Sequence, residues 1–285
     1  MSVNAQLRWR KFVSNFMLTM TGVCALVSVA VLFFILGYLV YHGGAAINWD
    51  FFTKLPAPVG ENGGGMANAI VGSAIMVGLA ALIGLPVGFL GGIYLSEFSG
   101  KTYGFLVRYM ADLLNGVPSI VIGIFAWTVI VVPMHTYSAL AGGFALSLML
   151  IPITMRSTEQ FLLNVPRSLR EGALALGAPK WKVIGTVAVP AAMRGILTGM
   201  ILGVARVAGE SAPLLFTALN NEFWPTGLRQ PTAALPVMIY KHAMAPFDDY
   251  HRQAWAAGLV LLAMVLITNV TARFIASRGI AVQKG

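Results

Sequence analysis

Long apolar stretches, separated by shorter polar ones, run along the whole chain. A helix rises ~1.5 Å per residue, so about 20 apolar residues cross a ~30 Å hydrocarbon core. The pattern predicts six membrane-spanning helices at about 17–41, 68–95, 113–133, 139–156, 194–219 and 254–276. The expected fold class is therefore all-α, a polytopic membrane helix bundle that forms a single transmembrane domain over residues 1–285.

The remaining segments differ in composition. The apolar run 12–41 is too long for the core of a signal peptide and ends in no small-residue cleavage site, so a retained anchor is expected. Residues 42–67 are rich in Gly and Pro, which predicts an irregular outer loop. A second outer loop is predicted at 220–253, with a short helix at 235–243. Three of its basic side chains match no metal-ligand spacing and are expected on a solvated surface: Lys241, His242 and His251.

Glycines recur every fourth residue in two of the predicted spans. This spacing places them on one helix face and allows close approach of a neighbouring backbone. The second and fifth spans carry them at Gly84, Gly88 and Gly92, and at Gly195, Gly199 and Gly203. We therefore expect both helices to pack tightly along these faces.

Composition agrees with a membrane protein. The chain is 58% hydrophobic and 10% charged, with a mean hydropathy of +0.78, which excludes an ordinary soluble domain. The single cysteine, Cys24, cannot form an intrachain disulfide, and neither redox chemistry nor a metal cluster is expected.

The net charge of +9 is distributed unevenly. Cytoplasmic loops of membrane proteins carry an excess of Lys and Arg. Of the 19 Lys and Arg residues, 14 lie on the predicted inner side: Arg8, Arg10, Lys11, Lys101, Arg108, Arg156, Arg167, Arg170, Lys180, Lys182, Arg194, Arg273, Arg278 and Lys284. Four lie on the predicted outer side, at Lys54, Arg229, Lys241 and Arg252. This asymmetry predicts that both the N- and the C-terminus are cytoplasmic.

A long polar interruption at 157–193 is the predicted cytoplasmic loop, and its central part is 166–190. Ser168 and Glu171 stand three apart, the spacing of a capping box, so a short helix is expected to begin at Leu169.

The second half of this loop contains further helix signals. Gly177 can adopt the left-handed conformation that ends the first helix. Pro179 suits the first turn of a second helix, expected to run through Ile184 before Pro190 limits it. Two basic helices at a corner also fit a DNA-binding helix-turn-helix. The flanking membrane spans favour a cytoplasmic docking element instead.

Two ionisable residues lie inside the predicted fifth span. Arg206 is twelve residues beyond Arg194, or ~18 Å along a helix, which places it near the bilayer midplane. Glu210 is one turn further on the same face, so we expect the two to neutralise each other partly. Arg is well suited to binding a tetrahedral oxyanion, which makes both residues candidates for a substrate pathway. The alternative is an internal ion pair that only fixes helix packing.

The cytoplasmic loop resembles the EAA loop of type I ABC importer permeases. The match consists of Glu171, Ala173, Gly177 and Pro190 at the family's spacing. Three positions depart from the family pattern, with Gly172 for Ala, Val187 for Ile and Val189 for Leu. The resemblance implies the MetI-like permease fold. It also implies that this loop docks on an ATPase subunit through Glu171, Gly177 and Pro179.

The run around Arg206 and Glu210 is similar to the permeases of the bacterial phosphate ABC importer, in which it reads ARxxGETAPLL. Here Ser211 replaces the Thr. Further similar pieces lie at 63–69, 115–121, 177–182 and 221–224, and the resemblance extends from about residue 50 to the C-terminus.

This resemblance implies a permease subunit that moves inorganic phosphate from periplasm to cytoplasm across the bacterial inner membrane. The implied partners are a homologous second permease, an ATPase dimer and a periplasmic phosphate-binding protein, with no nucleic acid. No cofactor is expected on this chain, because the ATPase would bind ATP and Mg.

Other function classes are weighed against this one. The sister permease, or a permease for sulfate or molybdate, is disfavoured by the Ala-Pro-Leu-Leu after Ser211. A secondary transporter would not need the loop at 166–190, and no His-Glu-x-x-His or Gly-x-Ser-x-Gly supports a hydrolase. Ser99-Gly100-Lys101-Thr102 ends like a Walker A motif, but Leu95 stands where its first Gly is required. The chain is therefore not expected to be an enzyme on its own.

Overall fold

The computed structural model describes residues 3–58 and 63–279. Within these residues the chain is all-helical and contains no strand, so the predicted fold class is confirmed. Five long helices form most of the molecule: α1 (Val3–Gly44), α3 (Ala67–Glu97), α7 (Ala139–Leu163), α10 (Val189–Ala208) and α13 (Asp248–Gly279). Lys284, one of the cations assigned to the inner side, lies outside the described residues.

Shorter elements connect the long helices. Between α1 and α7 these are α2 (Trp49–Thr53), α4 (Lys101–Gly116), α5 (Ser119–Ala126), the π-helix η1 (Trp127–Val131) and α6 (Val132–Met134). Between α7 and α13 they are α8 (Arg167–Ala175), α9 (Lys180–Val183), the π-helix η2 (Ile184–Ala188), α11 (Ala212–Thr217) and α12 (Leu235–Ala243).

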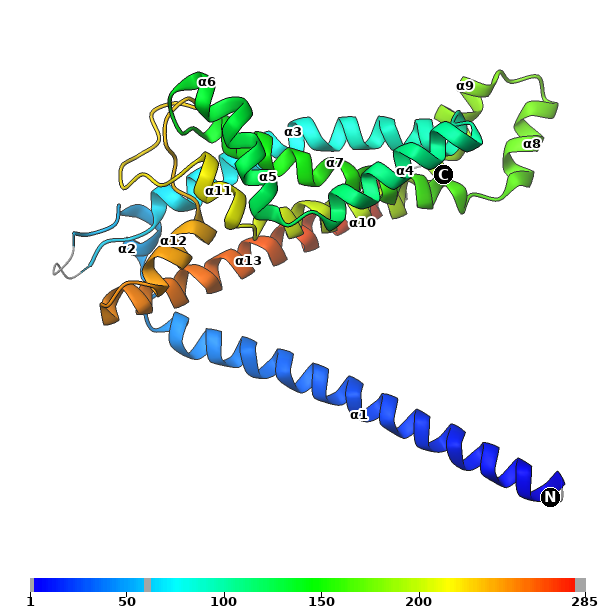
Figure 1. Ribbon diagram of the computed structural model, residues 1–285, viewed down its shortest axis with the longest axis horizontal. Helices are drawn as coiled ribbons and strands as arrows, with labels where there is room; N and C mark the ends of the chain where they lie inside the picture. Colours follow the sequence, from blue (N-terminus) through cyan, green and yellow to red (C-terminus); the bar gives the residue numbers. More distant parts are fainter. Residues whose placement is uncertain (1–2, 59–62, 280–285) are drawn as a thin grey trace.

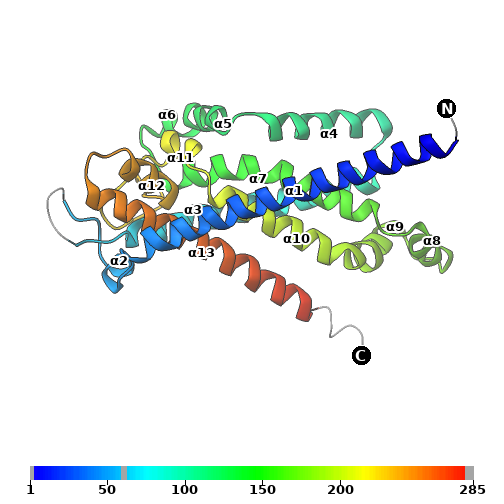
Figure 2. The same cartoon turned by 90° about the horizontal axis from the view of Figure 1, so that it is seen from below.

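The bundle has two distinct ends. Helices α8 and α9 lie at one end, together with both ends of the described chain, and α2, α6 and α12 lie at the other (Figure 1). We call these the α8 end and the α12 end. Figure 2 shows the same arrangement from below, with α1 and α13 diverging from each other toward the α8 end.

Five helices of the described chain are long and apolar enough to cross a membrane, namely Gln6–Gly44, Ala67–Glu97, Ala139–Leu163, Lys180–Ala208 and Asp248–Thr271. The remaining predicted span, the third in chain order, is a bent pair, Thr102–Gly116 and Ser119–Met134, with 101° between its halves. The expectation of one helix over 113–133 is therefore wrong. Pro118 is the cause, because a proline disfavours the helical conformation of the residue before it, and Val117 is extended.

The predicted fifth span, 194–219, is also interrupted. Helix α10 ends at Ala208, and α11 begins at Ala212 after a short break. Pro213 explains the break, because its ring would clash with the carbonyl of Gly209 in a continuous helix.

Pro190, by contrast, does not end a helix as predicted. It lies in the first turn of α10, which continues directly from the wider π-helical turn η2. A second π-helical turn, η1, comes directly before Pro133 in the same way. In both places the wider turn accommodates a proline that would disrupt a regular α-helix.

Helix α7 is the centre of the bundle. A Cβ on Gly88 of α3 would lie 2.6 Å from Cβ of Thr154 and 2.8 Å from the carbonyl oxygen of Ile151. A Cβ on Gly203 of α10 would lie 3.1 Å from side-chain atoms of Leu150 and Ile153. The two predicted glycine faces therefore pack on the same helix, α7.

The α12 end has its own small core. Phe51 of α2, Met66, and Leu235 and Met238 of α12 are buried together there. The prediction of a wholly irregular loop at 42–67 is therefore wrong, because α2 lies within it. Its first turn is capped by Asn48, whose Oδ1 accepts a hydrogen bond from the backbone N–H of Phe51 at 2.8 Å.

The short helix predicted at 235–243 is confirmed as α12, but the solvated surface expected for His242 is wrong. Its side chain is 3% exposed and stacks on Tyr250 with 4.3 Å between ring centroids. Burial, and then the neighbouring charge of Lys241, lowers the pKa of His242 to about 4. Lys241 is exposed as expected, and its Nζ lies 3.0 Å from Glu222 Oε1.

Replacing Gly88 by Ala should destabilise the protein by about 1–3 kcal/mol, because the added methyl group overlaps α7. Gly78→Ala on the same helix is the matched control, since a Cβ there meets nothing within 4 Å. It should be neutral or stabilising by up to ~1 kcal/mol. Thermal unfolding of the two variants in detergent measures the difference. Equal melting temperatures would contradict close packing of α3 on α7.

Candidate functional site

Arg206 and Glu210 line one small polar cavity of about 130 Å³. Its other polar lining residues are Asn115 and Ser119. Apolar side chains complete its walls: Leu114, Val117, Met149 and Ile153. We call this cavity the arginine pocket.

Two helix breaks meet at the arginine pocket. Asn115 lies in the last turn of α4 and Ser119 is the first residue of α5, on either side of the bend at Pro118. Arg206 lies in the last turn of α10, and Glu210 lies in the break before α11. Non-helical backbone at membrane depth is tolerated only where it is buried in protein or lines a cavity. Broken helices also form the binding sites of many transporters.

Helices α5 and α11 pack closely beside this pocket. A Cβ on Gly123 of α5 would lie 2.7 Å from Cα of Pro213 in α11. This contact holds the two breaks next to each other, although Asn115 and Arg206 are far apart in the sequence.

Arg206 and Glu210 do not form a direct ion pair, although their spacing in the sequence suggests one. The two side chains form no ion pair within 4.0 Å, and neither has a hydrogen-bond partner among the described residues. The cause is the end of α10 at Ala208, which removes Glu210 from the helical register that would place it beside Arg206. The pocket therefore holds a free donor group and a free acceptor group.

These groups suit an oxyanion. The guanidinium of Arg206 offers five N–H donors, and the amide of Asn115 and hydroxyl of Ser119 add neutral donors. The N–H groups of Ser119 and Ile120, the first two of α5, have no acceptor within their own helix. Among the described residues, no group of three or more His, Cys, Asp and Glu side chains could hold a metal ion.

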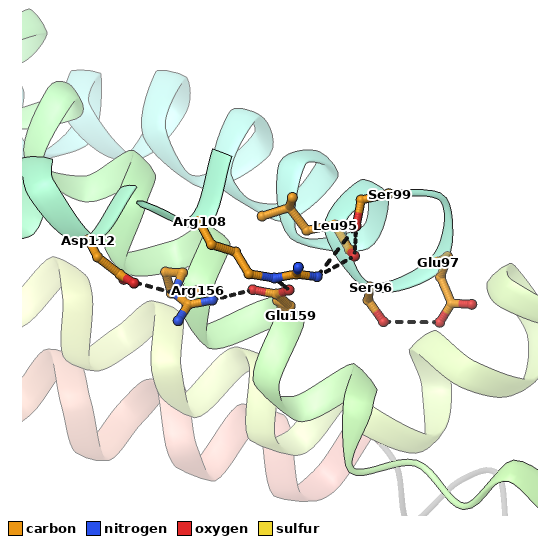
Figure 3. Close-up of polar contacts among 8 residues, drawn as sticks. All are labelled: Leu95, Ser96, Glu97, Ser99, Arg108, Asp112, Arg156 and Glu159. Carbon is orange, nitrogen blue, oxygen red and sulfur yellow. Dashed lines mark hydrogen bonds and ion pairs between the residues drawn. The ribbon is translucent and has the colours of Figure 1, made fainter. Parts of the chain in front are cut away.

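A cluster of charged residues lies between the arginine pocket and the α8 end. Figure 3 shows its centre, Glu159 of α7, between two arginines. Its side chain is 1% exposed; Oε1 accepts a hydrogen bond from Arg108 Nε, and Oε2 lies 2.6 Å from Arg156 Nη1. The two arginines compensate the cost of burying the charged carboxylate of Glu159, because each one binds a different carboxylate oxygen.

The same arginines connect three helices. Arg156 of α7 also binds Asp112 of α4, with Nε 3.0 Å from Oδ1. Arg108 of α4 donates through Nη2 to the carbonyl oxygen of Leu95 in the last turn of α3, at 3.1 Å (Figure 3). A cation at this position is favourable because the last carbonyls of a helix carry partial negative charge. The cluster therefore fixes α4 against α7 and the end of α3.

Helix α8 is fixed to the same end of α3. Arg170 forms an ion pair with Glu97, the last residue of α3, and donates to the carbonyl oxygen of Leu162 at 2.6 Å. Lys180 of α9 donates to the carbonyl oxygen of Glu97, and its ammonium group lies 4.6 Å from the ring centroid of Phe98.

The three residues predicted to couple to an ATPase lie on or between α8 and α9. Gly177 has φ +80°, so its predicted left-handed conformation is observed, and Pro179 is the N-cap of α9. Glu171 is exposed, and its side chain has no partner in the part of the chain that the structure describes. The capping box predicted for it is wrong, because Pro166 is the N-cap of α8 and Ser168 lies within the helix.

Sequence reasoning missed the cluster around Glu159. Arg156 and Glu159 stand three apart in a helix, a spacing that signals an ion pair. Arg108 and Glu159 are 51 residues apart in the sequence, and Glu97 and Arg170 are 73 residues apart. No local sequence pattern therefore reveals these two ion pairs.

Comparisons with known proteins agree with this architecture. Residues 84–279 match the family described as binding-protein-dependent transport system inner membrane component. The chain is 43% identical over 268 residues to the phosphate transport system permease protein PstA of Yersinia pestis, covering 94% of this chain and 91% of that protein. It is 42% identical to PstA of Haemophilus influenzae, covering 96% and 98%.

Solved structures share the fold at low sequence identity. A bacterial ABC transporter involved in the import of alginate matches with a TM-score of 0.67 at 14% identity, over 95% of this chain and 98% of that one. The MetNI methionine ABC transporter in an inward-facing form matches with a TM-score of 0.59 at 17% identity, over 76% and 96%.

Replacing Glu159 by Ala should lower the free energy of unfolding by about 3 kcal/mol, because it leaves Arg108 and Arg156 without their shared buried partner. Asp112→Ala is the matched control. It removes a carboxylate that is 55% exposed and should cost ~1 kcal/mol or less. Denaturant titration of the full chain in detergent measures both, and an equal loss in the two variants would contradict a buried cluster centred on Glu159.

Proposed function

Because this chain belongs to the family of binding-protein-dependent transport system inner membrane components, we propose that it is a permease subunit of an ABC importer that moves inorganic phosphate from periplasm to cytoplasm. The observation that carries the proposal is the arginine pocket, in which the side chains of Arg206 and Glu210 have no partner among the described residues. A cationic group left free at a helix break inside a membrane protein is suited to a passing anion.

The relatives support phosphate as that anion. Two proteins named phosphate transport permeases are more than 40% identical to this chain over at least 94% of its length. The tetrahedral phosphate oxyanion fits a guanidinium group, which can donate two parallel hydrogen bonds to it.

Arg206 and Glu210 are then the substrate-pathway residues. Arg206 supplies attraction for phosphate. Glu210 limits the strength of that attraction, because conduction needs binding that is favourable enough for entry and weak enough for release.

The ATPase partner is proposed to dock on α8 and α9. Three large apolar side chains of these helices and their connection are strongly exposed: Leu176 at 90%, Trp181 at 72% and Leu174 at 48%. Exposed apolar groups on a basic polar loop fit the cleft of a protein partner. Glu171, Gly177 and Pro179 shape this surface. The partner ATPase would bind ATP and Mg, and this chain would act as a transport subunit without an ATP site of its own.

A second permease and a periplasmic phosphate-binding protein complete the proposed assembly. The most apolar window of α1 is 0% buried within the chain, so lipid and a neighbouring subunit are left to cover it. The α8 end carries both ends of the described chain and most of its basic residues, which supports a cytoplasmic position for this end in a bacterial inner membrane. The α12 end then faces the binding protein.

Gly177→Val should uncouple ATP hydrolysis from transport. A β-branched side chain at φ +80° is strained by ~1–3 kcal/mol, although a Cβ there meets nothing within 4 Å. Binding-protein-stimulated ATPase activity of the reconstituted complex should fall by at least ~5-fold. Gly177→Asn is the matched control and should retain most activity, because Asn tolerates the left-handed region. Full activity in Gly177→Val would exclude the turn from coupling.

Arg206→Gln should abolish labelled phosphate uptake by the assembled importer. Arg206→Lys should restore little, because an ammonium group cannot reproduce the guanidinium fork. Arg194→Gln removes a charge from the same helix that does not line the arginine pocket, and it should leave uptake near the parent level. The competing packing role makes the opposite prediction, namely that Arg206→Leu combined with Glu210→Leu transports normally. Normal uptake in that double variant would exclude Arg206 from the pathway.

A further inference from the structure

The carboxylate of Glu210 is an unexpected component of an anion pocket. It lines the same cavity of about 130 Å³ as Arg206, Asn115 and Ser119. It accepts no hydrogen bond from any described residue, and it forms no ion pair within 4.0 Å with Arg206. An ionised carboxylate is an acceptor only, so a ligand that contacts it must bring its own donor.

Tetrahedral oxyanions differ in exactly this property. At neutral pH inorganic phosphate carries one or two protons, and each is an O–H donor. Sulfate carries none and would present only lone pairs to Glu210. A protonated anion can therefore place its charged oxygens on Arg206 and its O–H on Glu210, whereas a fully deprotonated anion meets repulsion.

We propose that Glu210 is a specificity-determining residue that selects protonated tetrahedral oxyanions over deprotonated ones within the permease itself. The proposal rests on the proposed function, because it assumes that phosphate passes through the arginine pocket. It assigns the two charges separate roles: Arg206 binds anionic oxygens, and Glu210 accepts the proton-bearing oxygen. Arsenate, which is also protonated at neutral pH, belongs to the accepted class, and sulfate belongs to the rejected class.

The geometry supports separate roles. Helix α10 ends at Ala208, so Glu210 is carried by non-helical backbone and not by the helix that carries Arg206. If the only role of the carboxylate were to neutralise the arginine, a position in the continuous helix one turn away would serve better. The break separates the donor from the acceptor and leaves both on the wall of one cavity.

The test measures anion binding without relying on transport, since a periplasmic binding protein would itself select the anion delivered. In the assembled importer with Cys24→Ala, the substitution Leu114→Cys places a thiol on the cavity wall. Leu114 is 47% exposed, so the change is tolerable, and Val117→Cys is a second position on the same wall. Mass spectrometry follows alkylation of the thiol by a small neutral maleimide in the presence of phosphate, arsenate or sulfate.

Phosphate and arsenate should slow alkylation, and sulfate should need an at least ~10-fold higher concentration for equal protection. Glu210→Gln should bring sulfate within ~3-fold of phosphate, because the amide also offers N–H donors. Equal protection by phosphate and sulfate with Glu210 intact would overturn the inference while leaving the pathway in place. An unchanged difference in Glu210→Gln would overturn it as well.

A different set of results would contradict the proposed phosphate pathway itself. If no anion protects either thiol position, or if Arg206→Gln leaves protection by phosphate unaltered, the arginine pocket does not bind phosphate. Both the proposed function of the pocket and the inference about Glu210 then fail together.

Discussion

The close approach of two glycine faces to α7 is the packing interaction on which the rest of the structure depends. Glycines of α3 and α10 bring both helices so near to α7 that a single added methyl group would overlap it. In a lipid environment the hydrophobic effect does not drive helices together, so such close van der Waals packing becomes the main source of association. This packing positions the end of α10, which carries Arg206, against α7. Met149 and Ile153 of α7 line the arginine pocket together with Arg206.

Charged groups connect the helices of the arginine pocket to α8, at the other end of α4 and α7. Glu159 holds Arg108 and Arg156, which tie α4 to α7, and the last turn of α4 forms one wall of the pocket. The end of α3 receives Arg108 from α4 and Arg170 from α8. A movement of α8 driven by an ATPase would thus reach α4 through contacts that are all buried or partly buried. This continuity is a physical reason for the proposed docking helices α8 and α9 to share one subunit with the arginine pocket.

Much of this organisation could be predicted from the sequence, because those features depend on residues that are close together in the chain. Apolar length predicted the spans, four-residue spacing predicted the glycine faces, and one glycine before a proline predicted the left-handed turn at Gly177. The predictions that failed concern places where the local structure depends on residues distant in the sequence or on the geometry of a proline. Pro118 bends a predicted straight span by 101°, and the break before Pro213 separates Glu210 from Arg206. The burial of His242 depends on the stacked ring of Tyr250, which the local pattern around α12 does not reveal.

The central claim is that phosphate passes through the arginine pocket. Arsenic is an anomalous X-ray scatterer, so diffraction from crystals of the assembled importer soaked in arsenate can locate a phosphate analogue directly. The account predicts an arsenic peak within hydrogen-bond distance of the Arg206 guanidinium, with one oxygen directed at Glu210. An arsenic peak elsewhere along the membrane, with the arginine pocket empty and its side chains unmoved, would contradict it.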